Sequence, residues 1–103
     1  INMMEHATYS VASPEACASI VWRDSDMAAE AAEAMKLSAN NIFELKLIDE
    51  IIKEPLGGAH RNYDQASLNI KKSIINNLDR LNGIPLDDLV KKRYERLMSY
   101  GAL

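Results

Sequence analysis

The sequence predicts a helix-rich α/β fold with two short strands and about five helices. β-branched and aromatic residues gather in two short segments, one near the start of the chain and one near its middle. Helix caps, alanine-rich runs and apolar residues at helical spacing occupy the segments between and after them. Because two strands alone do not form a stable sheet in water, we expect both to complete a larger sheet.

Composition and charge narrow the class of protein. The chain has 103 residues, of which 48% are hydrophobic and 26% are charged, as in globular proteins. A net charge of −3 gives no support for binding to nucleic acid, and no apolar run approaches the roughly 20 residues of a membrane helix. The single cysteine, Cys17, excludes an internal disulfide and suits a reducing compartment. Because the chain starts at Ile1 and enters directly on strand-like residues, we expect a piece of a longer protein.

The first part of the chain predicts a strand followed by a helix. The strand lies within residues 3–12, where the β-favouring residues are Thr8, Tyr9 and Val11. Ser13 then caps a helix over residues 14–22, because its hydroxyl can accept a hydrogen bond from an early backbone N–H. Glu15 complements the positive end of the helix dipole.

Two further helices and a second strand follow. Asp26 is predicted to cap a helix over residues 27–35, whose alanines have high helix propensity. Ser38 caps a third, short helix that runs to about Leu45. Residues 47–52 are rich in β-branched side chains and predict a strand.

A glycine loop and a long helix come next. Residues 55–62 form the loop, because two adjacent glycines permit positive φ or close contact with another surface. Asn62 caps a helix over residues 63–82, which ends at Gly83. An apolar stripe runs along this helix at helical spacing and consists of Ile70, Ile74, Leu78 and Leu81.

The last helix opens at Ile84 and Pro85. It carries acidic residues in its first turn and basic residues in its C-terminal half, as the helix dipole favours. We interpret the basic run at residues 91–96 as a solvated helix face rather than a nucleic-acid site, because the chain is acidic overall. The predicted buried face of this helix consists of Leu86, Leu89, Val90, Tyr94 and Leu97.

The residues offer little catalytic chemistry. Neither His6 nor His60 has a second histidine or a cysteine at ligand spacing, so no metal site is predicted. His60 and Arg61 could hold a phosphate or a carboxylate, although an exposed loop arginine is more often solvated or paired with an acid. On local grounds Glu15 is a first-turn helix residue. With no nucleophile–base pair and no cofactor fingerprint, the residues by themselves predict no enzyme.

Five segments carry a resemblance to known proteins. Residues 9–15 and 47–52, which read Tyr-Ser-Val-Ala-Ser-Pro-Glu and Leu-Ile-Asp-Glu-Ile-Ile, resemble the later part of a crotonase-superfamily (ClpP/crotonase) domain. Residues 13–22, 54–61 and 93–101 closely resemble the alpha-subunit family of acetyl-coenzyme A carboxylase carboxyltransferases. These three read Ser-Pro-Glu-Ala-Cys-Ala-Ser-Ile-Val-Trp, Glu-Pro-Leu-Gly-Gly-Ala-His-Arg and Arg-Tyr-Glu-Arg-Leu-Met-Ser-Tyr-Gly.

This resemblance implies an architecture and a reaction. It places residues 1–62 in the C-terminal part of a crotonase-like core and residues 63–103 in a C-terminal helical extension. Alpha and beta subunits of the family form an alpha2–beta2 assembly that moves a carboxyl group from carboxybiotin, on a biotin carboxyl carrier protein, to acetyl-CoA. The product, malonyl-CoA, feeds fatty-acid synthesis in the cytoplasm. Oxyanion holes of backbone N–H groups stabilise the developing charge, and the glycine-rich segment that supplies one lies upstream of residue 1.

The same resemblance implies that this chain holds no catalytic side chain, metal or bound cofactor and is inactive by itself. Residues expected near substrate or a subunit interface are Ser13, Glu15, Gly57, Gly58, His60 and Arg61. The family usually has glycine where this chain has Ala16, which adds a methyl group at that turn. Two other interpretations stay open: another crotonase-type acyl-CoA enzyme, which the 54–61 segment disfavours, and a non-catalytic helical interaction module.

Overall fold

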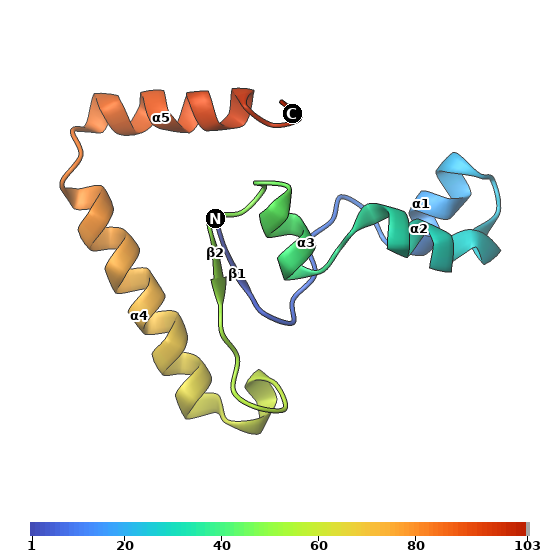
Figure 1. Cartoon of the computed structure of the whole chain (residues 1–103), viewed down its shortest axis with the longest axis horizontal. Helices are drawn as coiled ribbons and strands as arrows, with labels where there is room; N and C mark the ends of the chain where they lie inside the picture. Colours follow the sequence, from blue (N-terminus) through green and yellow to red (C-terminus); the bar gives the residue numbers. More distant parts are fainter. Residues whose placement is uncertain (103) are drawn as a thin grey trace. The chain divides into compact units, whose positions relative to one another are not determined.

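The computed structural model describes residues 1–102, and the chain divides into two compact units, Ile1–Ile51 and Ile52–Leu103. The predicted helix-rich α/β composition is confirmed, with two short parallel strands and five α-helices in the described residues. In chain order (Figure 1) the elements are β1 (Asn2–Met4), α1 (Pro14–Val21), η1 (Ser25–Met27), α2 (Ala28–Met35), α3 (Ala39–Glu44), β2 (Glu50–Ile52), η2 (Ala59–Arg61), α4 (Tyr63–Asn82) and α5 (Leu86–Met98), where η marks a 3-10 helix.

β1 and β2 lie side by side as a parallel pair, although they are far apart in the sequence (Figure 1). The backbone N–H of Asp49 donates to the carbonyl of Ile1 over 2.8 Å, next to the paired strands. α3 supplies apolar side chains that cover the pair. The buried cluster consists of Met3, Ala39, Ile42 and Ile48, with Ala7, Leu47 and Ile51 packed against it.

The first strand lies earlier than the residue pattern indicated. Pairing ends at Met4, because the N–H of Ala7 donates to the Met4 carbonyl over 3.1 Å and closes a turn. Of the residues that predicted the strand, Thr8 makes only an isolated antiparallel bridge and Val11 is fully exposed. β propensity expresses itself only where a partner strand is available, and the strands of residues 1–102 offer none to residues 9–12.

The second strand is shorter than predicted, because only Glu50–Ile52 of residues 47–52 is paired. Lys46 has a φ of 60°, and the N–H of Leu47 donates back into α3 over 3.2 Å, so the chain is still turning there. The apolar side chains of Leu47 and Ile48 nevertheless reach the buried cluster. Their hydrophobicity therefore serves the core without a strand conformation.

α1 and α2 pack against each other through small side chains. Ala18 of α1 and Ala31 of α2 are both completely buried. Alanine favours the helix, and its single methyl group also permits two helix backbones to approach closely. The alanine-rich composition of this segment thus determines both the local structure and the packing.

Three predicted helix caps are confirmed and one is wrong. The side chains of Ser13, Ser38 and Asn62 accept hydrogen bonds from backbone N–H groups three residues later, at 3.1, 3.4 and 3.0 Å. The cap predicted at Asp26 is not formed. Asp24 caps η1 instead, and its carboxylate accepts a hydrogen bond from the N–H of Asp26 over 2.9 Å. An acceptor two residues earlier in the chain therefore starts the turn before α2.

The helices of the first unit end on basic residues with positive φ. Arg23, Lys36 and Lys46 follow α1, α2 and α3 with φ values of 56°, 51° and 60°. The left-handed conformation costs an L-residue roughly 1–2 kcal/mol. A positive charge at a helix C-terminus offsets part of that cost through the helix dipole. Glycine is the usual residue at such positions, so the sequence did not mark them.

α4 and α5 expose most of their apolar side chains. α4 buries Ala66 and Ser73, and α5 buries none of its residues within the described chain. The buried face predicted for α5 is therefore wrong here, because Leu86, Val90 and Tyr94 are 79%, 70% and 64% exposed. The exposed apolar side chains of α4 are Leu68, Ile74, Ile75 and Leu78. Helical spacing identifies an apolar face but does not say what covers it.

Candidate functional site

The loop between β2 and α4 carries four of the six residues that the sequence singled out, namely Gly57, Gly58, His60 and Arg61. It opens with a β-turn, in which the carbonyl of Pro55 accepts a hydrogen bond from the N–H of Gly58 over 2.8 Å. Gly57 occupies the third position of this turn with a φ of 86°. A type II turn requires a positive φ at that position, which explains a glycine there.

Gly58 has a backbone conformation that residues with a Cβ atom avoid. Its φ of 105° and ψ of 167° lie in a region that is essentially reserved for glycine. The residue is also buried. Immediately after it, the N–H of Ala59 donates to a carboxylate oxygen of Glu54 over 2.9 Å, in a partly buried position. The turn on one side and the carboxylate on the other hold Gly58 in place.

The two basic side chains of the loop pack over the two glycines. A Cβ atom added at Gly57 would lie 3.0 Å from the Cγ of Arg61, and one added at Gly58 would lie 3.1 Å from the Cε1 and Nδ1 of His60. The missing side chains therefore let the Arg61 stem and the imidazole lie against the backbone. Both residues remain exposed.

α4 anchors both ends of this loop. At its exit, the Asn62 side chain caps α4 by accepting a hydrogen bond from the N–H of Gln65 over 3.0 Å. At its entry, the side-chain amide of Asn69 donates to the carbonyl of Lys53 over 2.9 Å. The Gln65 side chain donates to Asn69 over 2.8 Å and joins the two anchors. One helix thus holds the loop from both sides.

Ser13 and Glu15 lie in the other unit, at the start of α1. The Ser13 hydroxyl is engaged as a helix cap with the N–H of Ala16 over 3.1 Å. Glu15 is exposed in the first helical turn, where its charge suits the helix dipole. The four loop residues therefore lie in one unit, and Ser13 and Glu15 belong to the other.

The charges of the loop favour an anion. No salt bridge joins His60 or Arg61 to a carboxylate within residues 52–102. The Arg61 guanidinium and the His60 imidazole, carried by the same loop, are groups that can bind an oxyanion through charge-assisted hydrogen bonds.

No group of three or more His, Cys, Asp or Glu side chains in residues 1–102 could hold a metal ion. The helices of that same stretch lack the combination of length and apolar character that a membrane span requires.

Comparison with known proteins identifies the family of this chain. Residues 1–101 match the family model described as acetyl co-enzyme A carboxylase carboxyltransferase-like. The chain belongs to this family. It is 57% identical over 101 residues to the acetyl-coenzyme A carboxylase carboxyl transferase subunit alpha of Vibrio vulnificus (strain CMCP6). A protein of the same name from Alcanivorax borkumensis is 55% identical over 101 residues.

These relatives are longer than this chain. The matches cover 98% of this chain but only 32% of the Vibrio protein and 31% of the Alcanivorax protein. The chain therefore spans about a third of the length of the curated relatives that it matches. The family resemblance predicted from three short segments is confirmed.

Sequence reasoning missed two residues that build the loop of this family member. Glu54 accepts a hydrogen bond from a backbone N–H five residues later, and Asn69 reaches back sixteen residues to Lys53. Neither spacing belongs to a standard cap or turn motif, so the sequence pattern did not indicate these contacts. The available signal was the position of Glu54 directly before the Pro-Leu-Gly-Gly turn.

Proposed function

We propose that the protein is part of a carboxyltransferase alpha subunit that moves a carboxyl group from carboxybiotin, on a carrier protein, to acetyl-CoA. The product is malonyl-CoA for fatty-acid synthesis in the cytoplasm. The observation that carries this proposal is the family match across residues 1–101, supported by relatives with that name at 57% and 55% identity. Because the chain spans about a third of those relatives, the activity belongs to the assembled enzyme and not to this chain alone.

The short strands support a place within a larger domain. β1 and β2 have three residues each, and an isolated two-stranded pair is at best marginally stable in water. We assign them to the edge of a crotonase-like sheet whose other strands come from the rest of the subunit. In this arrangement residues 1–62 complete the core and residues 63–103 form a helical extension.

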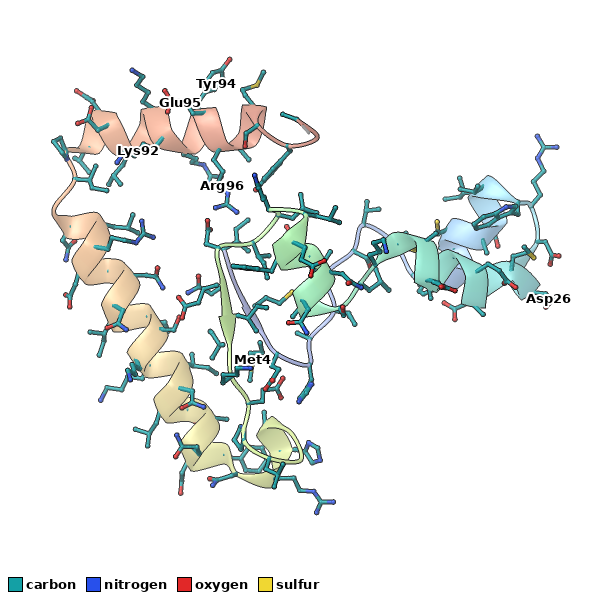
Figure 2. The ribbon with its side chains drawn as sticks, viewed as in Figure 1. Met4, Asp26, Lys92, Tyr94, Glu95 and Arg96 are labelled. Atoms are coloured by element: carbon teal, nitrogen blue, oxygen red, sulfur yellow. The ribbon has the colours of Figure 1, made fainter. Side chains whose placement is uncertain are left out.

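The exposed faces of α4 and α5 support a partner. Large apolar side chains are exposed along both helices, Tyr94 of α5 among them (Figure 2), and exposed apolar patches mark interaction surfaces. We define the α5 apolar face by Leu86, Val90, Tyr94 and Leu97 and assign it to an interface within an alpha2–beta2 assembly. The beta subunit and the biotin carboxyl carrier protein are the partners that the reaction requires.

The proposed chemistry needs no side-chain nucleophile from this chain. In carboxyl transfer, negative charge develops on the enolate of acetyl-CoA and on the ureido oxygen of biotin. Backbone N–H groups aimed at these positions lower the barrier, because they stabilise charge that appears only in the transition state. Biotin itself accepts the proton, so Glu15 need not act as a base. Biotin and acetyl-CoA are substrates of the assembled enzyme, and Ser13, Glu15 and the loop at residues 57–61 lie near substrate or an interface.

A segment exchange tests this function. The matching 101 residues of the Vibrio vulnificus alpha subunit are replaced by residues 1–101 of this chain, and the hybrid is produced with its partner subunit. Transfer between malonyl-CoA and biotin is then measured beside the unaltered enzyme. We expect kcat/KM within about tenfold of the parent, a loss of less than about 1.4 kcal/mol in transition-state stabilisation. An assembled hybrid with no measurable transfer would overturn the proposal.

A further inference from the structure

We propose that the loop at residues 57–61 binds a single oxyanion, a phosphate or a carboxylate, with Arg61 and His60 as its side-chain ligands. The chemical identity of the ligand follows from these residues, whereas its assignment to a substrate of carboxyl transfer rests on the proposed function. Three features carry the inference: a loop held in place before any ligand arrives, several donors on one short segment, and no acidic partner for the two side chains within residues 52–102.

The loop is organised in advance. The Pro55 carbonyl, the Glu54 carboxylate and the Asn62 side chain accept hydrogen bonds of 2.8, 2.9 and 3.0 Å around it. Gly58 fixes the backbone in a conformation that other residues avoid. Binding to a loop of this kind loses little conformational entropy, because the cost of ordering has already been met in folding.

The donors lie on one short segment. Contact with Gly57 pins the stem of Arg61, so the planar fork of its guanidinium loses less freedom when it grips two oxygens of an anion. Contact with Gly58 likewise orients the imidazole of His60. The backbone N–H groups of Gly57 and His60 make no hydrogen bond within the described residues, which adds two donors to the same loop.

The two side chains have no acidic partner in the part of the unit that the structure describes. Neither Arg61 nor His60 forms a salt bridge with residues 52–102. The acid nearest in sequence is Asp64, in the first turn of α4, and it forms no salt bridge with either side chain. The carboxylate of Glu54, before the loop, is engaged by the N–H of Ala59. An exposed arginine is ordinarily paired or simply solvated. Here the stem lies against Gly57, no carboxylate of residues 52–102 pairs with the guanidinium, and the same loop carries backbone N–H groups without an acceptor, which supports an anion site.

The proposed substrates offer two such anions. Coenzyme A carries phosphates in both thioesters, and malonyl-CoA carries in addition a carboxylate that acetyl-CoA lacks. Each group can present two oxygens to an arginine fork. Acetyl-CoA, used as an inhibitor of the reaction that starts from malonyl-CoA, therefore distinguishes the two sources.

The first test uses Arg61→Gln in the active hybrid, with Arg80→Gln as a matched control on exposed α4 surface. Because a hydrogen bond to a charged group contributes about tenfold or more in affinity, KM for malonyl-CoA should rise by that factor in Arg61→Gln and stay unchanged in the control. Arg61→Lys, which keeps the charge but loses the fork, should fall between them. A weaker inhibition by acetyl-CoA in Arg61→Gln identifies a phosphate, and unchanged inhibition identifies the carboxylate.

The result that overturns the inference is an active hybrid in which Arg61→Gln and Arg80→Gln have the same KM as the parent. An inactive hybrid counts against the proposed function instead, and a second measurement then decides the site. Amide resonances of the chain itself are followed by NMR during titration with inorganic phosphate at constant ionic strength. Saturable shifts confined to residues 57–61, and lost in Arg61→Gln, support the site. Shifts that are absent, or spread over the lysines of α5, exclude it.

Discussion

Gly58 determines the shape of the loop, and its replacement by alanine should destabilise the second unit. A φ of 105° with a ψ of 167° strains any residue that has a Cβ atom, at a cost of order 1–3 kcal/mol. The new Cβ would also lie 3.1 Å from the imidazole of His60, so the ring would have to move. Together these effects predict a loss of about 2–3 kcal/mol in the free energy of unfolding.

Gly83→Ala is the matched control for this change. Gly83 follows α4 with a φ of −80°, which alanine adopts readily. The nearest atom to an added Cβ is the Arg80 carbonyl oxygen at 3.9 Å, an ordinary contact. Alanine there restricts only the unfolded chain, so we expect no loss and a gain of up to about 1 kcal/mol.

Urea denaturation followed by far-ultraviolet circular dichroism measures both variants. With a slope of about 1–3 kcal/mol per molar urea, a loss of this size moves the midpoint by roughly 1 M. Gly58→Ala should therefore unfold at clearly lower urea than the parent, and Gly83→Ala at the same concentration or above. Equal midpoints for the two variants would refute the argument that backbone conformation makes Gly58 indispensable.

Four further changes follow from the structure. Ser13→Ala should cost about 1 kcal/mol in thermal or chemical unfolding through loss of the α1 cap, and an unchanged stability would show that the cap contributes nothing. Lys36→Gly should stabilise the chain by up to about 1 kcal/mol, because its φ of 51° is left-handed; a lower melting temperature would contradict this. Glu15→Gln in the hybrid should keep most activity, whereas a loss of about a thousandfold with intact assembly would make Glu15 an acid–base residue. Val90→Asp should change the stability of this chain by less than about 0.5 kcal/mol but weaken assembly of the hybrid in analytical ultracentrifugation. Normal assembly would place the interface elsewhere.

Much of the fold could be predicted from the sequence, because it depends on local chemistry. The caps at Ser13, Ser38 and Asn62 form as predicted, because a side-chain acceptor and its N–H donor lie only three residues apart. The glycine turn is also a local feature, since the positive φ of Gly57 is a property of one residue. Asp24 shows the limit, because two acidic residues compete for one helix start and only geometry selects between them.

The candidate site was predictable in its residues but not in its construction. The family resemblance pointed to Gly57, Gly58, His60 and Arg61, and the structure gathers these four in one loop. The hydrogen bond from the Ala59 N–H to the Glu54 carboxylate was not predicted, because it joins groups outside any standard motif spacing.

By itself the sequence determined the helices, most of their caps, the glycine turn and the family, because each depends on chemistry within a few residues or on a contiguous pattern. Only the tertiary structure decided which β-favouring residues find a partner strand. It also decided which helix ends adopt positive φ without glycine, and that the apolar faces of α4 and α5 stay exposed in this chain. Strand pairing and burial are relations between distant parts of a chain, so a pattern of residues can offer a surface but cannot supply what covers it.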